Sequence, residues 1–189
     1  MALDCGKLKR GIAAGCEPAT GGLQTTLVQL RKADIASYVR NALNPKLVTI
    51  TMKQGTKGYV FEGLGESNVA RAKMTPSKYG SPTYAHEVDM VAFTAAPADY
   101  ATAEDLAKDK TVSVVRDNNG NILVYGLNAG LTATKNDTDS ANADTGGAPE
   151  ITLASTKEKG LADFFAVMTP DGLVDPVATL AAFEALYAA

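Results

Sequence analysis

The sequence predicts a mainly β fold of the α+β class, an antiparallel β-sandwich or barrel with one internal helix and a C-terminal helix. Short runs of β-branched and aromatic residues recur along the chain, separated by Gly, Pro and Asn turns. Helical spacing of apolar residues is clearest in two places, residues 97–109 and 175–187. A chain of 189 residues, 46% of them hydrophobic, is long enough for one domain with a buried core.

The first predicted element is a strand at Leu23–Leu30. Its β-branched content favours a strand over a helix, although neither of its alternating faces is wholly apolar. Residues 31–43 then place apolar side chains at helical spacing and stop before Asn44 and Pro45. We expect a short helix or a bent connection there.

A hairpin is predicted next. Leu47–Lys53 alternates strictly, and Lys57–Leu64 carries a second aromatic and β-branched run after the turn at Gln54–Thr56. Residues 65–82 are polar and rich in turn residues, so they predict a protruding loop or an extended hairpin. The basic residues of this polar excursion are Arg71, Lys73 and Lys78.

The middle of the chain carries the clearest local signals. Thr83–Thr94 alternates as one long strand, and Pro97–Asp109 is the best helix because Pro favours a first helical turn. Thr111–Arg116 and Asn121–Tyr125 flank the turn residues Asp117–Gly120. Asn and Gly accept the positive φ angles of a tight turn, which predicts a hairpin.

The remaining elements complete the β-rich core. Residues 130–134 predict a further strand, and 135–149 form a polar surface loop. Residues 151–154 and 161–168 are expected to close the sheet. Residues 175–187 predict a helix capped by Asp175. Its expected apolar side contains Val177, Leu180, Ala181 and Leu186.

This division gives three parts. Residues 1–22 contain five Gly and Pro18 without a steady period, and we interpret them as an N-terminal arm. Residues 23–168 form the core domain, with its polar excursion at 65–82 and its loop at 135–149. Residues 169–189 are expected as a C-terminal helical appendage.

Charge argues against one class of function. The formal net charge is -3 and the pI is near 5.2, whereas a sequence-independent nucleic-acid binder needs a basic stripe to displace counterions. A mildly acidic wall suits a protein past which DNA must slide without sticking.

The two cysteines and the apolar stretches point to a protein made in the cytoplasm. Cys5 and Cys16 lie too close in sequence for a disulfide between them to stabilise a whole domain, and we expect free thiols in a reducing compartment. The five residues between Arg10 and Cys16 are too few for a signal peptide. Residues 164–182 contain two Pro and two Asp, which excludes a clean membrane span.

Catalytic motifs are absent from the sequence. His86 is the single histidine. The sequence therefore cannot supply a metal site with several imidazole ligands, and a Ser-His or Cys-His pair would have to use this one residue. In mid-strand it is expected to be a packed or surface residue. Ser67 lacks the second Gly of a nucleophile elbow, and residues 15–22 lack the Lys of a phosphate-binding loop. The sequence therefore predicts no catalytic, cofactor-binding or metal-ligating residue, and no enzyme.

One loop leaves an alternative open. Oxygen-bearing side chains of the kind that hold calcium gather in residues 137–144. They are Asp137, Asp139, Asn142 and Asp144. The spacing departs from a calcium-binding EF-hand loop at Ala141, and there is no closing Glu. A solvated loop is the other interpretation.

Several of these features together resemble tail-tube and related tail or neck proteins of phages that infect Bacteroides-like gut bacteria. They are the Cys- and Gly-containing N-terminus running into Gly21-Gly22, the first strand, and the hairpin with its polar excursion. The helix at Tyr100–Leu106, the hairpin VSVVRDNNGNILVYG at 112–126 and the strand after Gly146-Gly147 follow in order. The resemblance covers most of residues 15–155, and the C-terminal helix lies outside it.

The resemblance implies a tail-tube-like sandwich or barrel that packs side by side in six-fold or twelve-fold symmetry. The expected function is a non-enzymatic virion subunit of a tail or neck ring or tube, partnered by itself and other virion proteins, through which DNA passes. Residues 1–22 and 65–82 would be interface elements, made with the rest in the host cytoplasm. The alternative is a monomeric β-rich module that binds a ligand or a surface.

Overall fold

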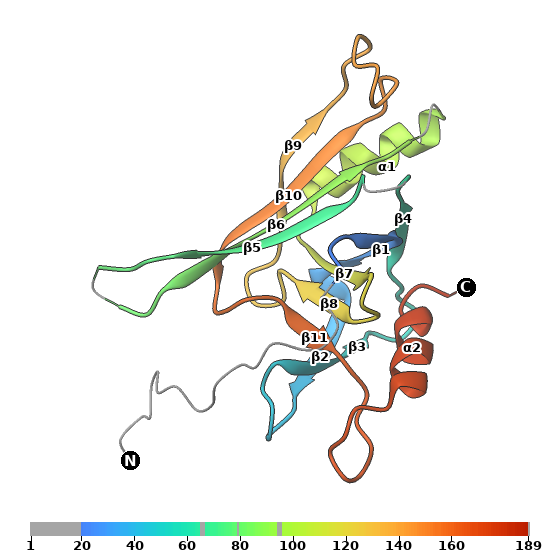
Figure 1. Cartoon of the computed structure of the whole chain (residues 1–189). Coiled ribbons are helices and arrows are strands. Elements are labelled where there is room, and N and C mark those ends of the chain that lie inside the picture. Colours follow the sequence, from blue (N-terminus) through green and yellow to red (C-terminus); the bar gives the residue numbers. More distant parts are fainter. Residues whose placement is uncertain (1–19, 65–66, 79, 94–95, 189) are drawn as a thin grey trace.

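The computed structural model of the chain describes residues 20–64, 67–78, 80–93 and 96–188 (Figure 1). The first half contains β1 (Leu23–Arg31), the 3₁₀ turn η1 (Lys32–Asp34), β2 (Ile35–Arg40), β3 (Leu47–Met52), β4 (Tyr59–Glu62), β5 (Val69–Thr75) and β6 (Thr83–Val91). The second half contains α1 (Pro97–Lys108), β7 (Thr111–Asp117), β8 (Ile122–Tyr125), β9 (Thr132–Asp137), β10 (Glu150–Glu158), β11 (Asp163–Phe165) and α2 (Pro176–Ala185).

The strands form two sheets. Sheet A has the order β2-β3-β11-β8-β7-β1-β4, and sheet B has the order β5-β6-β10-β9. All strand pairs are antiparallel except β11 with β3, which is parallel. The predicted fold class is confirmed: the chain is mainly β with two α-helices, one internal and one C-terminal. Across the described residues the strands form two sheets and no closed barrel, so of the two predicted forms the sandwich is observed.

Sheet A is the middle layer of the molecule. Its strands β1 and β7 bury consecutive residues, because one face packs against α2 and the other against sheet B and α1. The cluster on the α2 side includes Val28 and Val114, and the cluster between the sheets includes Leu27 and Val115. A strand buried on both faces shows no alternation between a polar and an apolar side, and the polar residues 24–26 lie in the first half of β1, which is not fully buried.

Sheet B is covered on one face only. The residues of β6 and β10 that alternate toward sheet A are buried, namely His86, Val88, Met90, Ile151, Leu153 and Ser155. The residues between them are half-buried, and all of them except Ala154 are polar. On that outer face Arg71 forms ion pairs with Glu87 and Asp89, and Lys135 pairs with Glu150.

Two predictions for the segment between residues 31 and 64 were wrong. Residues 32–40, the larger part of the segment 31–43, form the turn η1 and strand β2, because pairing with β3 satisfies the backbone and the β-branched and aromatic residues suit a strand. The predicted hairpin of β3 with β4 does not form. Strand β4 pairs with β1 instead, with Phe61 opposite Leu27, so that the Phe61 side chain packs onto the cluster between the sheets.

The C-terminal segment, expected as an appendage, is part of the core. Phe183 and Leu186 are buried in the cluster against sheet A, and Asp175 caps the helix by accepting hydrogen bonds from two backbone N–H groups. The predicted apolar side of the helix is right for Leu180 and Leu186, which pack in the cluster, and wrong for Val177, which is 81% exposed; Thr179 is buried in addition. The small residues of this helix make its apolar pattern ambiguous, and packing selects the face with Phe183.

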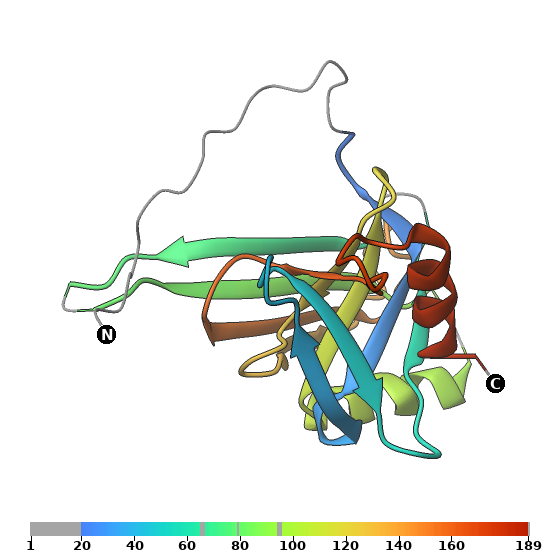
Figure 2. The same ribbon diagram turned by 90° about the horizontal axis from the view of Figure 1, so that it is seen from below.

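The polar excursion is largely an extended hairpin. Strand β5 pairs with β6 from Val69 opposite Asp89 to Thr75 opposite Thr83, and the turn lies beyond them. Figure 2 shows this hairpin projecting well past the rest of the molecule. The regular pairing of β10 with β6 ends at Ser155 opposite His86, and one shifted pair, Glu158 with Tyr84, follows it; from Thr75 opposite Thr83 outward the hairpin is a two-stranded ribbon. Such a ribbon is at best marginally stable by itself in water.

Residues 1–19 of the predicted N-terminal arm lie outside the described residues. Residues 20–22 are tied to the turn between β7 and β8: Asn119 exchanges two hydrogen bonds with the backbone of Thr20, and Asn118 binds the carbonyls of Gly21 and Gly22. None of the helices in the described part of the chain is long and apolar enough to cross a membrane.

Candidate functional site

His86 is a packed residue of the interface between the sheets. It is 3% exposed, its Nδ1 accepts a hydrogen bond from the Gly126 N–H at 3.1 Å, and its Nε2 lies 2.8 Å from the Gly160 carbonyl. Because Nδ1 accepts, Nε2 carries the proton and donates, which describes a neutral imidazole. Both ring nitrogens are hydrogen-bonded, and the His86 ring packs edge-to-face with the Tyr125 ring, with 5.4 Å between the two ring centroids. His86 therefore joins sheet B to sheet A and has no nitrogen left for catalysis or a metal.

Ser67 is held against Leu64. Its Oγ accepts a hydrogen bond from the Leu64 N–H at 3.0 Å. A Cβ at Gly63 would lie 2.4 Å from this oxygen, so any larger residue there would have to displace the Ser67 side chain. The Ser67 hydroxyl therefore has a local structural role.

The acidic loop does not converge on a cation position. Asp139 accepts a hydrogen bond from the Ala141 N–H, Asn142 Oδ1 accepts one from the Asp144 N–H, and the Asn142 amide donates to Glu150. In the part of the chain that the structure describes, no group of three or more His, Cys, Asp or Glu residues lies close enough to hold a metal ion.

A buried polar cluster that the sequence did not reveal links the two sheets. Glu158, 1% exposed, accepts hydrogen bonds from the N–H groups of Asn128 and Ala129 and from the Asn128 amide. Lys32 Nζ donates to the carbonyls of Leu127 and Asn128 at 2.8 and 2.6 Å. Burial lowers the pKa of Lys32, and the nearby Glu158 charge opposes that shift. The register shift at the end of β10 hides Glu158 from any periodic pattern.

The edges of the two sheets differ in chemistry. The edge strands of sheet B carry Lys73 and Lys135, the kind of residue that discourages further strand pairing. Edge strand β2 of sheet A carries no lysine, and its single charge, Arg40, is held by Asp163 at 2.7 Å. Strand β2 exposes large apolar side chains instead, with Val39 at 67% exposure.

The backbone of β2 is also open toward the outside. The Asn41 N–H donates to the Leu47 carbonyl, so these two residues form a hydrogen-bonded pair of the antiparallel ladder. Hydrogen-bonded and non-hydrogen-bonded pairs alternate. The N–H and C=O groups of Tyr38 and Arg40 therefore point away from β3, toward any strand that comes alongside.

Strand β4, at the other edge of sheet A, is partly covered. The same alternation, fixed by the hydrogen bond from the Gly63 N–H to Thr25, turns the backbone of Val60 and Glu62 outward. The Gly58 N–H, which lies in line with them, already donates to the Leu186 carbonyl at 2.7 Å. The C-terminal end of the chain thus closes the first part of this edge and leaves the rest open.

The two ends of sheet B carry opposite charges. Residues 73–83, at the tip of the β5–β6 hairpin, contain two Lys and no acidic residue. Residues 136–149, the end of β9 and the loop to β10, contain three Asp and no basic residue. Because Glu150 pairs with Val91 at the far end of β6, the acidic loop lies at the opposite end of the sheet from the basic tip, as Figure 1 shows.

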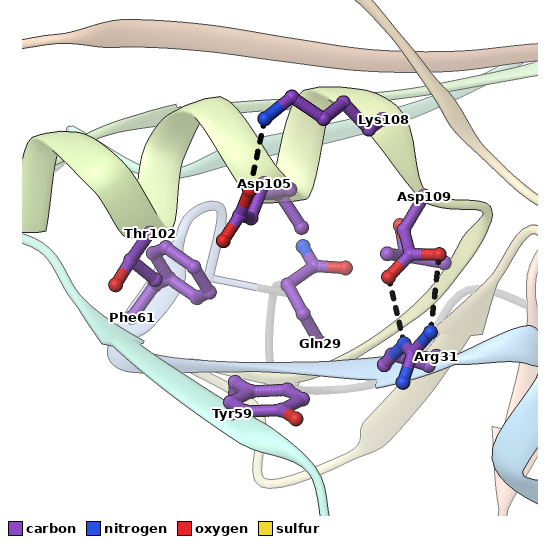
Figure 3. Close-up of a pocket in the computed structure, with 10 residues that line it drawn as sticks. Gln29, Arg31, Tyr59, Phe61, Thr102, Asp105, Lys108 and Asp109 are labelled. Carbon is purple, nitrogen blue, oxygen red and sulfur yellow. Dashed lines mark hydrogen bonds and ion pairs between the residues drawn. The ribbon is translucent and has the colours of Figure 1, made fainter.

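A cavity of 430 Å³ lies between α1 and sheet A (Figure 3). The strands give it Gln29, Arg31, Tyr59, Phe61 and Thr111, and helix α1 with its end gives it Thr102, Asp105, Leu106, Lys108 and Asp109. Its floor contains two buried polar groups without a hydrogen-bond partner among the described residues, Gln29 Nε2 and Thr111 Oγ1. The sequence offered one sign of this site, the lone Gln29 on the face of the first strand that also contains Leu27.

We found no match to the chain among protein-family models, curated proteins or solved structures.

Proposed function

We propose that the chain is a non-enzymatic structural subunit that assembles with copies of itself into a ring or tube of a bacteriophage tail or neck. The observation that supports this best is the open β2 edge of sheet A, with its apolar side chains and its outward backbone groups. Monomeric proteins protect such an edge, and an assembling protein uses it. The phage assignment itself follows from the resemblance in the sequence.

Strand β2 of one copy pairs in this proposal with the open part of β4 in the next copy. Such a contact joins two different surfaces, so it is heterologous and repeats around an axis to give a ring or a helix. Sheet A would continue from subunit to subunit, and the hydrogen bonds of the shared edge would hold the ring. The acidic balance of the chain keeps DNA mobile in the lumen.

Rings stack through the two ends of sheet B. The basic tip of the hairpin in one copy, with Lys73, faces the acidic loop of a copy in the next ring. This contact gives the distal ribbon of the hairpin the packing that it lacks in the isolated subunit. Complementary charge fixes the direction of stacking and its dependence on salt.

The first experiment measures the mass of the native particle by light scattering, with negative-stain microscopy, over a range of concentrations. The wild-type chain is expected to form rings or tubes. Val39→Lys places a charge on the open edge and is expected to give monomers. Val177→Lys makes the same change at an exposed helical site and should assemble normally. A wild-type chain that stays monomeric at high concentration would contradict the proposal.

A second experiment separates stacking from ring formation. Lys73→Glu with Lys78→Glu is expected to shorten tubes to single rings, because the tip then repels the acidic loop. Asp137→Lys with Asp144→Lys should do the same. The protein with all four changes restores the attraction and should stack again. Failure of this rescue, with intact rings, would remove the stacking contact and leave the lateral one in place.

The alternative of a monomeric binding module has one specific observation in its favour, the cavity beneath α1. It predicts a particle of one chain in both experiments above.

A further inference from the structure

We propose that the cavity between α1 and sheet A is a binding site for a small, neutral, flat molecule that carries a carboxamide or an equivalent donor and acceptor pair. This site belongs to the folded subunit and does not depend on whether the subunit assembles.

The strand register builds the floor of the cavity. Gln29 on β1 lies directly between Tyr59 on β4 and Ser113 on β7, and Arg31 lies opposite Thr111. Directly opposed residues point to the same face of a sheet, here the face beneath α1. The helix lies above it, and Thr102, Asp105, Leu106 and Asp109 follow the spacing of one helical face.

Two groups of this floor are unusual for a protein interior. Gln29 and Thr111 are each 1% exposed. The Ser113 hydroxyl donates to Gln29 Oε1 at 2.9 Å, which leaves the amide nitrogen facing the space under the helix (Figure 3). Neither this nitrogen nor Thr111 Oγ1 has a partner among the described residues. Buried polar groups are nearly always hydrogen-bonded, and a ligand that binds beside them is one explanation for two groups without a partner.

The walls and rim select the class of ligand. Tyr59 and Phe61 supply aromatic surface on one side, and Leu106 supplies apolar surface from the helix. The charges at the rim compensate each other: Arg31 binds Asp109 at 2.7 Å, and Lys108 binds Asp105 at 3.0 Å. A rim that is neutral as a whole does not favour an ion. A flat apolar body fits the walls, and a single polar end fits the floor.

A carboxamide meets both unpartnered groups. Its carbonyl oxygen accepts a hydrogen bond from Gln29 Nε2, and its N–H donates one to Thr111 Oγ1. The cavity of 430 Å³ is within the range of small-molecule sites, roughly 300 to 1,000 Å³, and holds a ring with such a group. Benzamide is the simplest probe of this kind.

The experiment is saturation-transfer NMR of benzamide with the full chain, which observes the ligand and so works for a monomer or an assembly. We expect saturable binding with a dissociation constant on the order of 1 mM, as suits a fragment of this size. Thr111→Val and Gln29→Leu each remove one hydrogen bond at nearly constant shape and should weaken binding about tenfold. Benzene, which has no carboxamide, should bind more weakly than benzamide.

The controls keep the result interpretable. Thr134→Val makes the same change at an exposed position on β9 and should leave benzamide binding unchanged. Gln29→Leu deprives the Ser113 hydroxyl of its acceptor, so circular dichroism must show that it folds. Thr111→Val breaks no hydrogen bond in the described structure and provides the test if Gln29→Leu does not fold. The proposal is overturned if folded wild-type protein shows no saturable binding, or if Thr111→Val binds benzamide as the wild type does.

Discussion

Sheet A and sheet B use the same chain in different ways. Sheet A lies between two layers, so β7 buries five consecutive residues, Thr111 to Val115. Sheet B has one covered face, so β10 alternates between buried Ile151 and Leu153 and half-buried neighbours. The interior of sheet A therefore serves stability on both faces, whereas the outer face, edges and ends of sheet B remain available for contacts.

The difference extends to the edges. Sheet B carries lysines on its edge strands and opposite charges at its two ends, while β2 of sheet A is apolar and open. Lysines oppose strand pairing, and an open apolar edge invites it. In the proposed assembly, sheet A joins neighbours within a ring and sheet B joins one ring to the next.

The largest expected effect tests the one-sided burial of sheet B. Leu153→Ala removes a fully buried side chain from the cluster between the sheets, and we expect a loss of about 3 kcal/mol in the free energy of unfolding. Thr152→Ala, on the outer face of the same strand, should cost less than about 1 kcal/mol. Urea unfolding followed by circular dichroism measures both. Equal costs at the two positions would show that sheet B is covered on both faces.

Sheet A should show no such alternation. Val114 and Val115 are both fully buried, Val114 toward α2 and Val115 toward sheet B. We expect each of Val114→Ala and Val115→Ala to cost about 2 kcal/mol in the same unfolding measurement. A large cost at only one of the two positions would mean that one face of sheet A is not covered. A small cost for Val114→Ala would identify the α2 side as the open face, and a small cost for Val115→Ala the sheet B side.

The local signals of the sequence were enough for elements that are set by neighbours in the chain, and not for the pairing of strands that are distant in the chain. The strict alternation of β6 and the Asp117–Gly120 turn of the β7–β8 hairpin are set by neighbours in the chain, and both were predicted correctly. The pairing of β4 with β1 is set by contacts between distant residues, which no local pattern records. The alternation of polar and apolar residues identifies a strand that has one solvent-exposed face. A strand that is buried on both faces shows no such alternation.

The candidate site was predictable to a smaller extent. Gln29 is one of several polar residues in the first strand, and only the structure shows that Ser113 satisfies its oxygen and leaves its nitrogen without a partner among the described residues. Thr111 could not be recognised from the sequence either, because threonine is common at the start of a strand. Its burial depends on the covering helix α1.

A smaller effect tests helix α2, which covers one face of sheet A. Asp175 accepts hydrogen bonds from the Val177 and Ala178 N–H groups, at 3.0 and 2.9 Å, and so caps α2. We expect Asp175→Ala to lower the free energy of unfolding by about 1 kcal/mol. Asp171→Ala, at an exposed position in the preceding loop, is the matched control and should be near neutral. Equal effects from both would show that the cap does not stabilise this layer.

The smallest effect concerns a residue shared by the two sheets. Tyr125 lies in the cluster between them, and its burial, with a further contribution from the negative charge of Asp117, raises the pKa of its phenol above the ordinary value of 10.0. A group whose pKa is raised by folding contributes stability that is complete below its unfolded pKa and is lost as the pH rises through its folded pKa. The wild type should therefore lose stability above about pH 10.

Tyr125→Phe removes this dependence and isolates it. Lys32, whose pKa burial lowers, contributes with the opposite sign, since its charged form is disfavoured by folding and stability rises as it loses its proton. Lys32 is present in both proteins, so the difference between their free energies of unfolding reports Tyr125 alone. We expect the stability of the wild type relative to Tyr125→Phe to fall as the pH rises from about 8 to about 11. A difference that stays constant over this range would place the phenol in water and so open the junction between the two sheets.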